Sequence, residues 1–363
     1  MIADKKKYTS KTYLKAFAIS SIVILSCIAL AGYIIDPFFQ YRVNTESHYI
    51  LNPRLINGGL AKNYDYNTVL LGSSMVQNYN MSILRRNHPD VKPVKLSSGG
   101  MNITEMEYLY SFVRMDSTKD FIINIDIALF NQYGIGNRYP KYLYESGILN
   151  KLKYLYGYET WMQYIPADMG MMLYFRIKKN IPLAYKMKTS IDDIGNNSFD
   201  VQYNAEKVKT QYVNGISVSP QTMEDIKPRM ETRLDSLLAR MQIDNHKDIR
   251  YTFVFSSYSA LYWYHAKRYD YYEPFMDFVY YFNKSLEKYD NTRIAFFFDR
   301  EEITDLNYYS DITHFGPVLS DSILSNIYSP RYELNAQNIG CRMSAVDSLV
   351  NSFIEKNKDW LPK

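Results

Sequence analysis

Residues 16–35 form an apolar run without a charged side chain, and this run most restricts how the chain can fold. A helix of that length spans roughly 30 Å, the thickness of a bilayer core. Asp36 follows the run, and a cluster of lysines precedes it: Lys5, Lys6, Lys7, Lys11 and Lys15. The positive-inside rule then predicts a cytoplasmic basic tail (1–15), a single-pass transmembrane anchor (16–35) and an extracytoplasmic remainder.

Two other interpretations of this run concern processing. Ala29-Leu30-Ala31 fits the pattern of a signal-peptide cleavage site, and the residues before Cys27 approximate a lipoprotein box. The apolar run continues past both positions, which favours an uncleaved anchor. In every case the residues after the run lie outside the cytoplasm, at the cell membrane or beyond it.

Composition excludes several classes of protein. The net charge is +4, and with five lysines in the tail the remainder is close to neutral, which argues against a nucleic-acid partner. Two cysteines, Cys27 and Cys341, cannot form a disulfide framework or a zinc cluster in the folded part. The histidines lack metal-ligand spacing, and the sequence has neither a P-loop nor a dinucleotide fingerprint, so we expect no metal and no cofactor.

Short apolar runs alternate with amphipathic helical patterns after residue 67. This alternation predicts a three-layer α/β domain with a parallel sheet over residues 68–363. We expect residues 36–67 to form a stalk or lead-in, since Asn57-Gly58-Gly59 and Asn52-Pro53 are typical of turns. About 131–219 is expected to be a mostly helical insertion, loop-like over 192–220. A capping box of Thr104 and Glu107 predicts one helix start. Strands are expected at residues 68–71, 91–96, 121–127, 250–255 and 294–298.

Ser74 is the candidate nucleophile, because it follows the predicted strand 68–71 by a short turn. We expect Gly72 to provide a tight or left-handed turn that projects the serine outward. A structural alternative is that Ser73 or Ser74 only caps a helix. His314 is the one histidine with an aspartate, Asp311, three positions earlier. Such a carboxylate can bond Nδ1 of the imidazole and leave Nε2 to accept a serine proton.

Gly99, Gly100 and Asp126 also follow predicted strands. Carboxyl ends of parallel strands share one edge of a sheet, so we expect these residues near Ser74 and His314. An aromatic group follows another strand, where it forms either a wall of a sugar cleft or the margin of the core: Tyr258, Tyr262, Trp263 and Tyr264.

Three short blocks resemble the SGNH/GDSL hydrolase superfamily: Gly72-Ser73-Ser74, Ser98-Gly99-Gly100 and Asp311-Ile312-Thr313-His314. The likeness covers about residues 68–326 in plan. It is greatest to membrane-anchored, extracytoplasmic members that act in O-acylation of bacterial cell-surface polymers. The resemblance implies a flavodoxin-like three-layer fold, with Ser74 as nucleophile and Asp311 and His314 as acid and base. It also implies that the Gly99 or Gly100 N–H binds the oxyanion.

The third block departs from the family pattern Gly-x-Asn-Asp, whose asparagine donates to the oxyanion. Here the strand end reads Asn124-Ile125-Asp126-Ile127. An ionised Asp126 only accepts hydrogen bonds, and Asn124 lies two residues deeper on the same face. Asp126 is then structural, or an acceptor polymer completes the site.

The expected function is that of a serine esterase or O-acyltransferase acting on acyl esters of a cell-surface polysaccharide or envelope polymer. The resemblance also implies a membrane-bound acyltransferase as the partner that supplies the acyl group. The alternative function is a catalytically weak or inactive domain that binds glycan or scaffolds an envelope assembly.

Overall fold

A computed structural model of the chain describes residues 10–43, 53–131, 134, 138–166, 202–215 and 226–362. In this part of the chain the core is a six-stranded sheet with the order β2-β1-β3-β4-β5-β6. The first five strands are parallel, and β6 runs antiparallel to β5. The strands are β1 (Thr68–Gly72), β2 (Pro93–Ser97), β3 (Asp120–Asn124), β4 (Arg250–Phe255), β5 (Thr292–Phe296) and β6 (Glu333–Leu334).

All five predicted strands are present; β4 has the predicted bounds, and the other four have shifted ends. β2 begins at Pro93, a position where a strand tolerates the missing N–H of proline. β3 ends at Asn124, so Asp126 lies beyond the strand instead of within it. The two-residue β6 was not predicted, because so short a segment has no readable periodicity.

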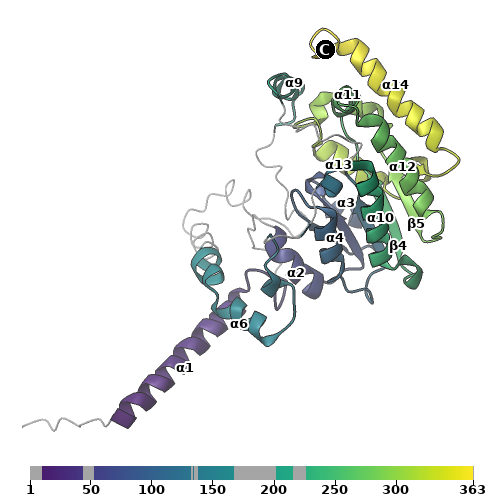
Figure 1. The fold of residues 1–363 in the computed structure, drawn as a ribbon. Coiled ribbons are helices and arrows are strands. Elements are labelled where there is room, and N and C mark those ends of the chain that lie inside the picture. The colour runs from purple at the N-terminus through teal and green to yellow at the C-terminus, as the bar shows by residue number, and fades with distance from the viewer. Residues whose placement is uncertain are drawn as a thin grey trace, which may run out of the picture.

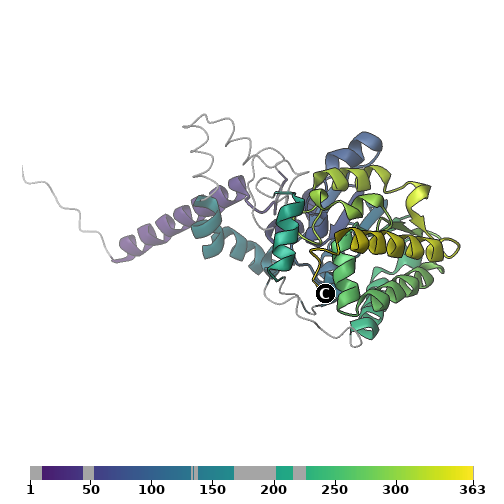
Figure 2. The same cartoon turned by 90° about the horizontal axis from the view of Figure 1, so that it is seen from above.

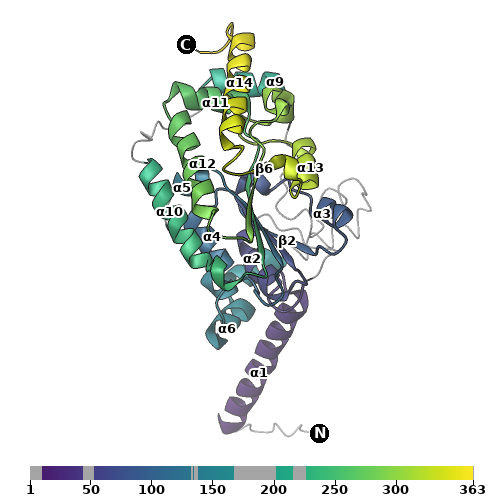
Figure 3. The same ribbon diagram turned by 90° about the vertical axis from the view of Figure 1, so that its right-hand side faces the viewer.

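Helices cover both faces of the sheet, which Figure 3 views nearly edge-on. Strand residues are buried throughout β1, β2 and β3, as expected for a parallel sheet covered on two sides. One side carries α4 (Ile103–Tyr110), α10 (Ile226–Met241) and α12 (Tyr272–Leu286), and the other carries α3 (Met81–Asn87) and α13 (Pro317–Asn326). Further along the chain, α11 (Ala260–Arg268) packs against α14 (Ile339–Asn357).

The start of α4 differs from the prediction. Its capping box is formed by Asn102 and Glu105, not by Thr104 and Glu107. The Asn102 side chain accepts a hydrogen bond from the Glu105 N–H at 2.9 Å. Glu105 is fully buried between Arg54 and Arg138, and this ion-pair cluster fixes the helix start.

Helix α1 (Ser10–Ile35) extends away from the domain (Figures 1 and 2). Among the described residues it is the one helix long and apolar enough to cross a membrane. Only Gly32 of α1 is buried. The apolar side chains of the helix therefore face outward, as a lipid-exposed surface would require.

Asp36 joins α1 to the domain. It has a left-handed backbone with φ of 44° and is 2% exposed. Its carboxylate accepts hydrogen bonds from the backbone N–H groups of Gln40, Tyr41 and Arg42 at 2.8–2.9 Å. The hydroxyl of Tyr154 donates a fourth bond at 2.7 Å. The chain leaving α1 is thus fixed in one conformation.

The described parts of the expected stalk at 36–67, residues 36–43 and 53–67, belong to the folded domain. It contains α2 (Pro53–Asn63), which packs against β2, and the Asn57 side chain donates to the Ser97 carbonyl at 3.0 Å. A Cβ on Gly59 would lie 2.2 Å from the carbonyl oxygen of Phe38. Gly59 is therefore required for close packing, and not for the turn that was predicted at Gly58-Gly59.

The insertion expected at about 131–219 is described in two pieces. They contain the 3₁₀-helix η2 (Lys141–Leu143), α6 (Ile148–Tyr156), the π-helical segment η3 (Glu159–Tyr164) and α9 (Ala205–Val213). Residues 167–201 and 216–225 lie outside the described residues. The loop-like prediction for 192–220 is wrong at α9, because Asn204 caps the N–H groups of Glu206 and Lys207 and starts a helix.

Candidate active site

Ser74 lies at the carboxyl end of β1 and begins the 3₁₀-helix η1 (Ser74–Val76). Ser73 is the N-cap of this turn, and its Oγ accepts a hydrogen bond from the Met75 N–H at 3.3 Å. The two neighbouring serines therefore differ: Ser73 caps the helix, and the Ser74 hydroxyl takes no part in the cap.

Gly72 does not have the left-handed backbone that the sequence suggested. A Cβ at this position would lie 2.8 Å from a methyl carbon of Val76 and 3.0 Å from Cβ of Asn124. Glycine is needed here because η1 folds back closely onto β1 and β3. That close approach places the turn that carries Ser74 directly over the carboxyl edge of the sheet.

Ser74, His314 and Asp311 form a continuous hydrogen-bonded series. Ser74 Oγ lies 2.8 Å from His314 Nε2, although the two residues are 240 positions apart. His314 Nδ1 lies 2.7 Å from Asp311 Oδ2. This is the geometry in which a histidine takes a proton from a serine while a carboxylate fixes its tautomer.

A short closed loop carries Asp311 and His314. Tyr309 and Phe315 pair as an isolated antiparallel bridge across its base. Ser259 donates its hydroxyl to the Ile312 carbonyl at 2.6 Å, which ties the loop to the segment after β4. Thr313, for which no role was predicted, donates its N–H and its hydroxyl to Asp311 Oδ1, at 2.8 and 2.9 Å.

These contacts shift the pKa values of Asp311 and His314. Burial raises the pKa of Asp311, but hydrogen bonds from His314 and Thr313 outweigh it and lower the pKa to about 2. Burial lowers the pKa of His314, but bonding to Asp311 and, more weakly, the charge of Asp126 raise it above the ordinary value. The side chains of His314 and Asp311 remain 38% and 39% exposed, so a substrate can reach them.

The loop after β2 borders the same edge, because β1 pairs with both β2 and β3. Strand order reverses between β1 and β3, the place where open α/β sheets bind ligands. Within the described part of the chain, no group accepts a hydrogen bond from the backbone N–H of Ser74, Gly99 or Gly100. Gly100 has a left-handed φ of 62°, which favours glycine.

Two arginines hold this loop from behind. Arg54 donates to the Gly99 carbonyl at 2.7 Å, and Arg138 donates to the Gly100 carbonyl at 3.2 Å. Both arginines also pair with the buried Glu105, at 3.2 and 2.7 Å. This support was not predicted, since its members are far apart in the sequence. It fixes the loop through its carbonyls and leaves its N–H groups available.

Asp126 is 1% exposed and supports the nucleophile turn. Its carboxylate accepts hydrogen bonds from the Ser73 hydroxyl at 2.6 Å, the Leu129 N–H at 3.2 Å and the Asn124 amide at 3.3 Å. Asn124 Oδ1 in turn accepts from the Ser256 hydroxyl. Both side chains are thus engaged with each other and with the protein, and the Asn124 amide donates to Asp126.

The second described piece of the insertion packs against the loop that carries His314. A Cβ on Gly316 would lie 2.9 Å from the ring of Tyr203. Asn78 donates to the Tyr203 hydroxyl at 3.0 Å and to the Phe315 carbonyl at 3.1 Å. This segment therefore forms part of the surroundings of the site.

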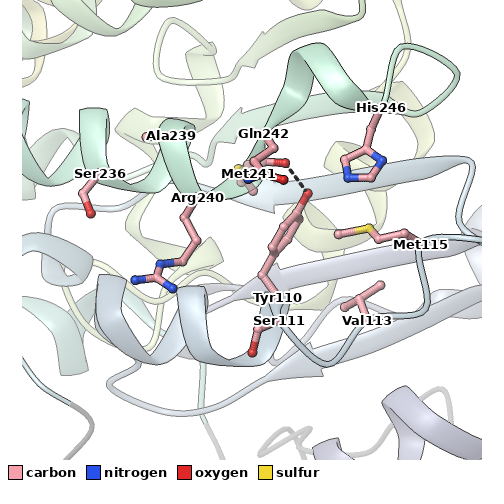
Figure 4. Close-up of a pocket in the computed structure, with 10 residues that line it drawn as sticks. All are labelled: Tyr110, Ser111, Val113, Met115, Ser236, Ala239, Arg240, Met241, Gln242 and His246. Atoms are coloured by element: carbon pink, nitrogen blue, oxygen red, sulfur yellow. Dashed lines mark hydrogen bonds between the residues drawn. The ribbon is translucent and has the colours of Figure 1, made fainter.

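Other candidate features lie away from this site. Tyr258, Tyr262 and Trp263 are buried in the core, and Tyr264 is half-buried against it. This places the aromatic group at the margin of the core and not in the wall of a sugar cleft. A cleft of about 610 Å³ lies between α4 and α10 (Figure 4) and includes Met115, before β3, and His246, before β4. It therefore borders the amino-terminal edge of the sheet, opposite Ser74. Among the described residues, no three metal-binding side chains gather as ligands.

Comparison of the chain with protein-family models finds no match. Comparison with curated proteins also finds none.

Proposed function

We propose that this protein is an SGNH-like serine esterase or O-acyltransferase. One observation carries the proposal: the hydrogen-bonded series from Ser74 through His314 to Asp311, with distances of 2.8 and 2.7 Å. Unengaged backbone N–H groups at Ser74, Gly99 and Gly100 supply the second requirement, donors for an oxyanion.

In this mechanism Ser74 Oγ attacks the carbonyl carbon of an acyl ester while its proton passes to His314 Nε2. Asp311 stabilises the resulting imidazolium, and the backbone N–H groups bind the oxyanion. Collapse of the tetrahedral intermediate breaks the ester C–O bond, and His314 protonates the leaving alcohol. Water or a sugar hydroxyl then attacks the acyl-serine, again with His314 as base, and releases Ser74.

We also propose a place and a substrate class. Helix α1 anchors the protein in the cell membrane with its N-terminus cytoplasmic, and the domain acts outside on a cell-surface polysaccharide or envelope polymer. The apolar α1 and the preceding lysines support this arrangement. In the direction of transfer, a membrane-bound acyltransferase supplies the acyl group.

The test is active-site labelling of the full-length protein with a fluorophosphonate, alongside hydrolysis of an aryl acetate. Ser74→Ala should abolish both, while the matched variant Ser344→Ala, on the distant helix α14, should retain both. Labelling of Ser74→Ala at the wild-type level would remove this serine from the mechanism.

A second candidate is a catalytically weak domain that binds glycan. It is favoured by one observation: the Asn124 amide, which would serve as a third oxyanion donor, bonds to Asp126 instead. Loss of one such donor typically costs on the order of 10²–10³ in rate. Absence of labelling at Ser74 in folded protein, with and without acetylated polysaccharide, would favour this candidate.

A further inference from the structure

Helix α6 and the following η3 expose an unusual amount of apolar surface. Leu149 is 77% exposed, more than any other apolar side chain in the described domain, and Ile148 is 70% exposed. Further exposed apolar side chains on these two elements and the link between them are Leu152, Tyr156, Tyr158 and Met162. The members within α6 fall in an arc of roughly 100° around the helix, so they form one continuous face.

The opposite side of α6 packs against the protein and against α1. Tyr154 points inward to Asp36, and a Cβ on Gly32 of α1 would lie 3.5 Å from the side chains of Leu155 and Trp161. Figures 1 and 3 show α6 beside the domain end of α1. The exposed apolar face is thus held at a fixed position relative to the anchor.

The contacts between α6 and α1 also fix how far along α1 the C-terminal end of α6 lies. The Tyr156 hydroxyl donates to the Leu25 carbonyl at 3.3 Å. Leu25 lies ten residues before the end of α1, roughly 15 Å along the helix axis. A helix needs about 20 residues to cross a bilayer core, and every window of that length within Ser10–Ile35 includes Leu25. If α1 spans the membrane, the C-terminal end of α6 therefore lies within the bilayer.

Two polar groups of aromatic side chains in this region fit such a place. In hydrocarbon each polar hydrogen needs a partner within the protein. The Tyr156 hydroxyl has the Leu25 carbonyl, and the Trp161 indole N–H donates to the Leu155 carbonyl at 2.6 Å. Lys151 and Lys153, both exposed, flank the apolar face on its two sides. Their long side chains can reach the phosphate level while the stems stay in apolar surroundings.

We propose that α6 and η3 form an interfacial membrane-binding element that inserts its apolar face into the phospholipid leaflet from which α1 emerges. The partner is the lipid bilayer itself. The domain is then held to the membrane at two points, the spanning helix and the inserted face. This inference rests on the membrane anchoring proposed above.

The experiment uses full-length protein in nanodiscs of phosphatidylcholine and phosphatidylglycerol, and the chain supplies its own controls. Cys27 is exposed on α1, and Cys341 is exposed on α14, at the end of the molecule away from α1. Single-cysteine proteins are made with Cys27 alone, Cys341 alone, Leu149→Cys alone, and Tyr158→Cys alone. Each is labelled with bimane, and quenching by phosphatidylcholine with a nitroxide on its acyl chain is measured.

We expect loss of fluorescence at Leu149→Cys and Tyr158→Cys of the same order as at Cys27, and none at Cys341. Quenching at Cys27 without quenching at Leu149 and Tyr158 would overturn the interfacial element and leave the anchor intact. Quenching at none of the sites would overturn both. Bimane at Leu149→Cys and Tyr158→Cys that is shielded from lipid, together with cross-linking of the same unlabelled cysteines to a second copy, would show that this face binds protein instead.

Discussion

Replacing Asp311 with asparagine separates the chemical role of this side chain from its structural one. In the wild type, Asp311 Oδ1 accepts three hydrogen bonds from Thr313 and the His314 N–H, while Oδ2 faces His314 Nδ1. An asparagine oxygen can keep the first three bonds. Its amide then donates to Nδ1, which moves the imidazole hydrogen to Nε2, where it blocks proton transfer from Ser74.

The expected loss in kcat for the reversed tautomer is about 10⁴, or ~5.5 kcal/mol in the activation free energy. The effect on folding should be far smaller. The lowered pKa of Asp311, about 2 against 3.8, corresponds to at most ~2.5 kcal/mol of stabilisation. Since the side chain is 39% exposed, solvent screening reduces this to about 1 kcal/mol.

The assay is hydrolysis of an aryl acetate by full-length protein, with thermal unfolding measured on the same samples. Asp305→Asn is the matched control, because Asp305 is an exposed aspartate six residues earlier that caps a neighbouring turn. We expect the control to hydrolyse ester at the wild-type rate. An Asp311→Asn protein that stays folded and keeps more than about a tenth of wild-type kcat would refute the tautomer argument.

Two further predictions concern pH, and a third concerns packing. The reactive form of His314 is neutral and its pKa is raised, so kcat/KM should fall as pH drops through a midpoint above the ordinary histidine value of about 6.5. Asp126→Asn removes one of the charges that raise this pKa and should move the midpoint of the measured pH profile downward; an unchanged midpoint would contradict that assignment. Gly59→Ala should lower the free energy of unfolding by about 1–3 kcal/mol in denaturant titration, because the added methyl meets the Phe38 carbonyl. A Gly59→Ala protein as stable as wild type would show that α2 can shift without cost.

The serine, histidine and aspartate could be predicted because each follows an apolar strand, and parallel strands bring their carboxyl ends to one edge. Partners that depend on long-range packing could not. Asp126 meets Ser73 across 53 residues, with no local pattern to indicate it. The predicted start of α4 at Thr104 was wrong, because burial of Glu105 between two arginines favours the capping box of Asn102 and Glu105. Gly59 looked like a turn residue, yet it is required by a close backbone contact.

The Asp36 junction has a consequence for how this protein can search for substrate. A domain on a loose tether samples a volume set by the length of its linker. Here four hydrogen bonds to one carboxylate remove that freedom at the point where the chain leaves α1. In the membrane-anchored esterase proposed above, the Ser74 hydroxyl would then be carried at one height and one tilt above the bilayer, so lateral diffusion of the anchor and the reach of the polymer would decide which ester groups it meets.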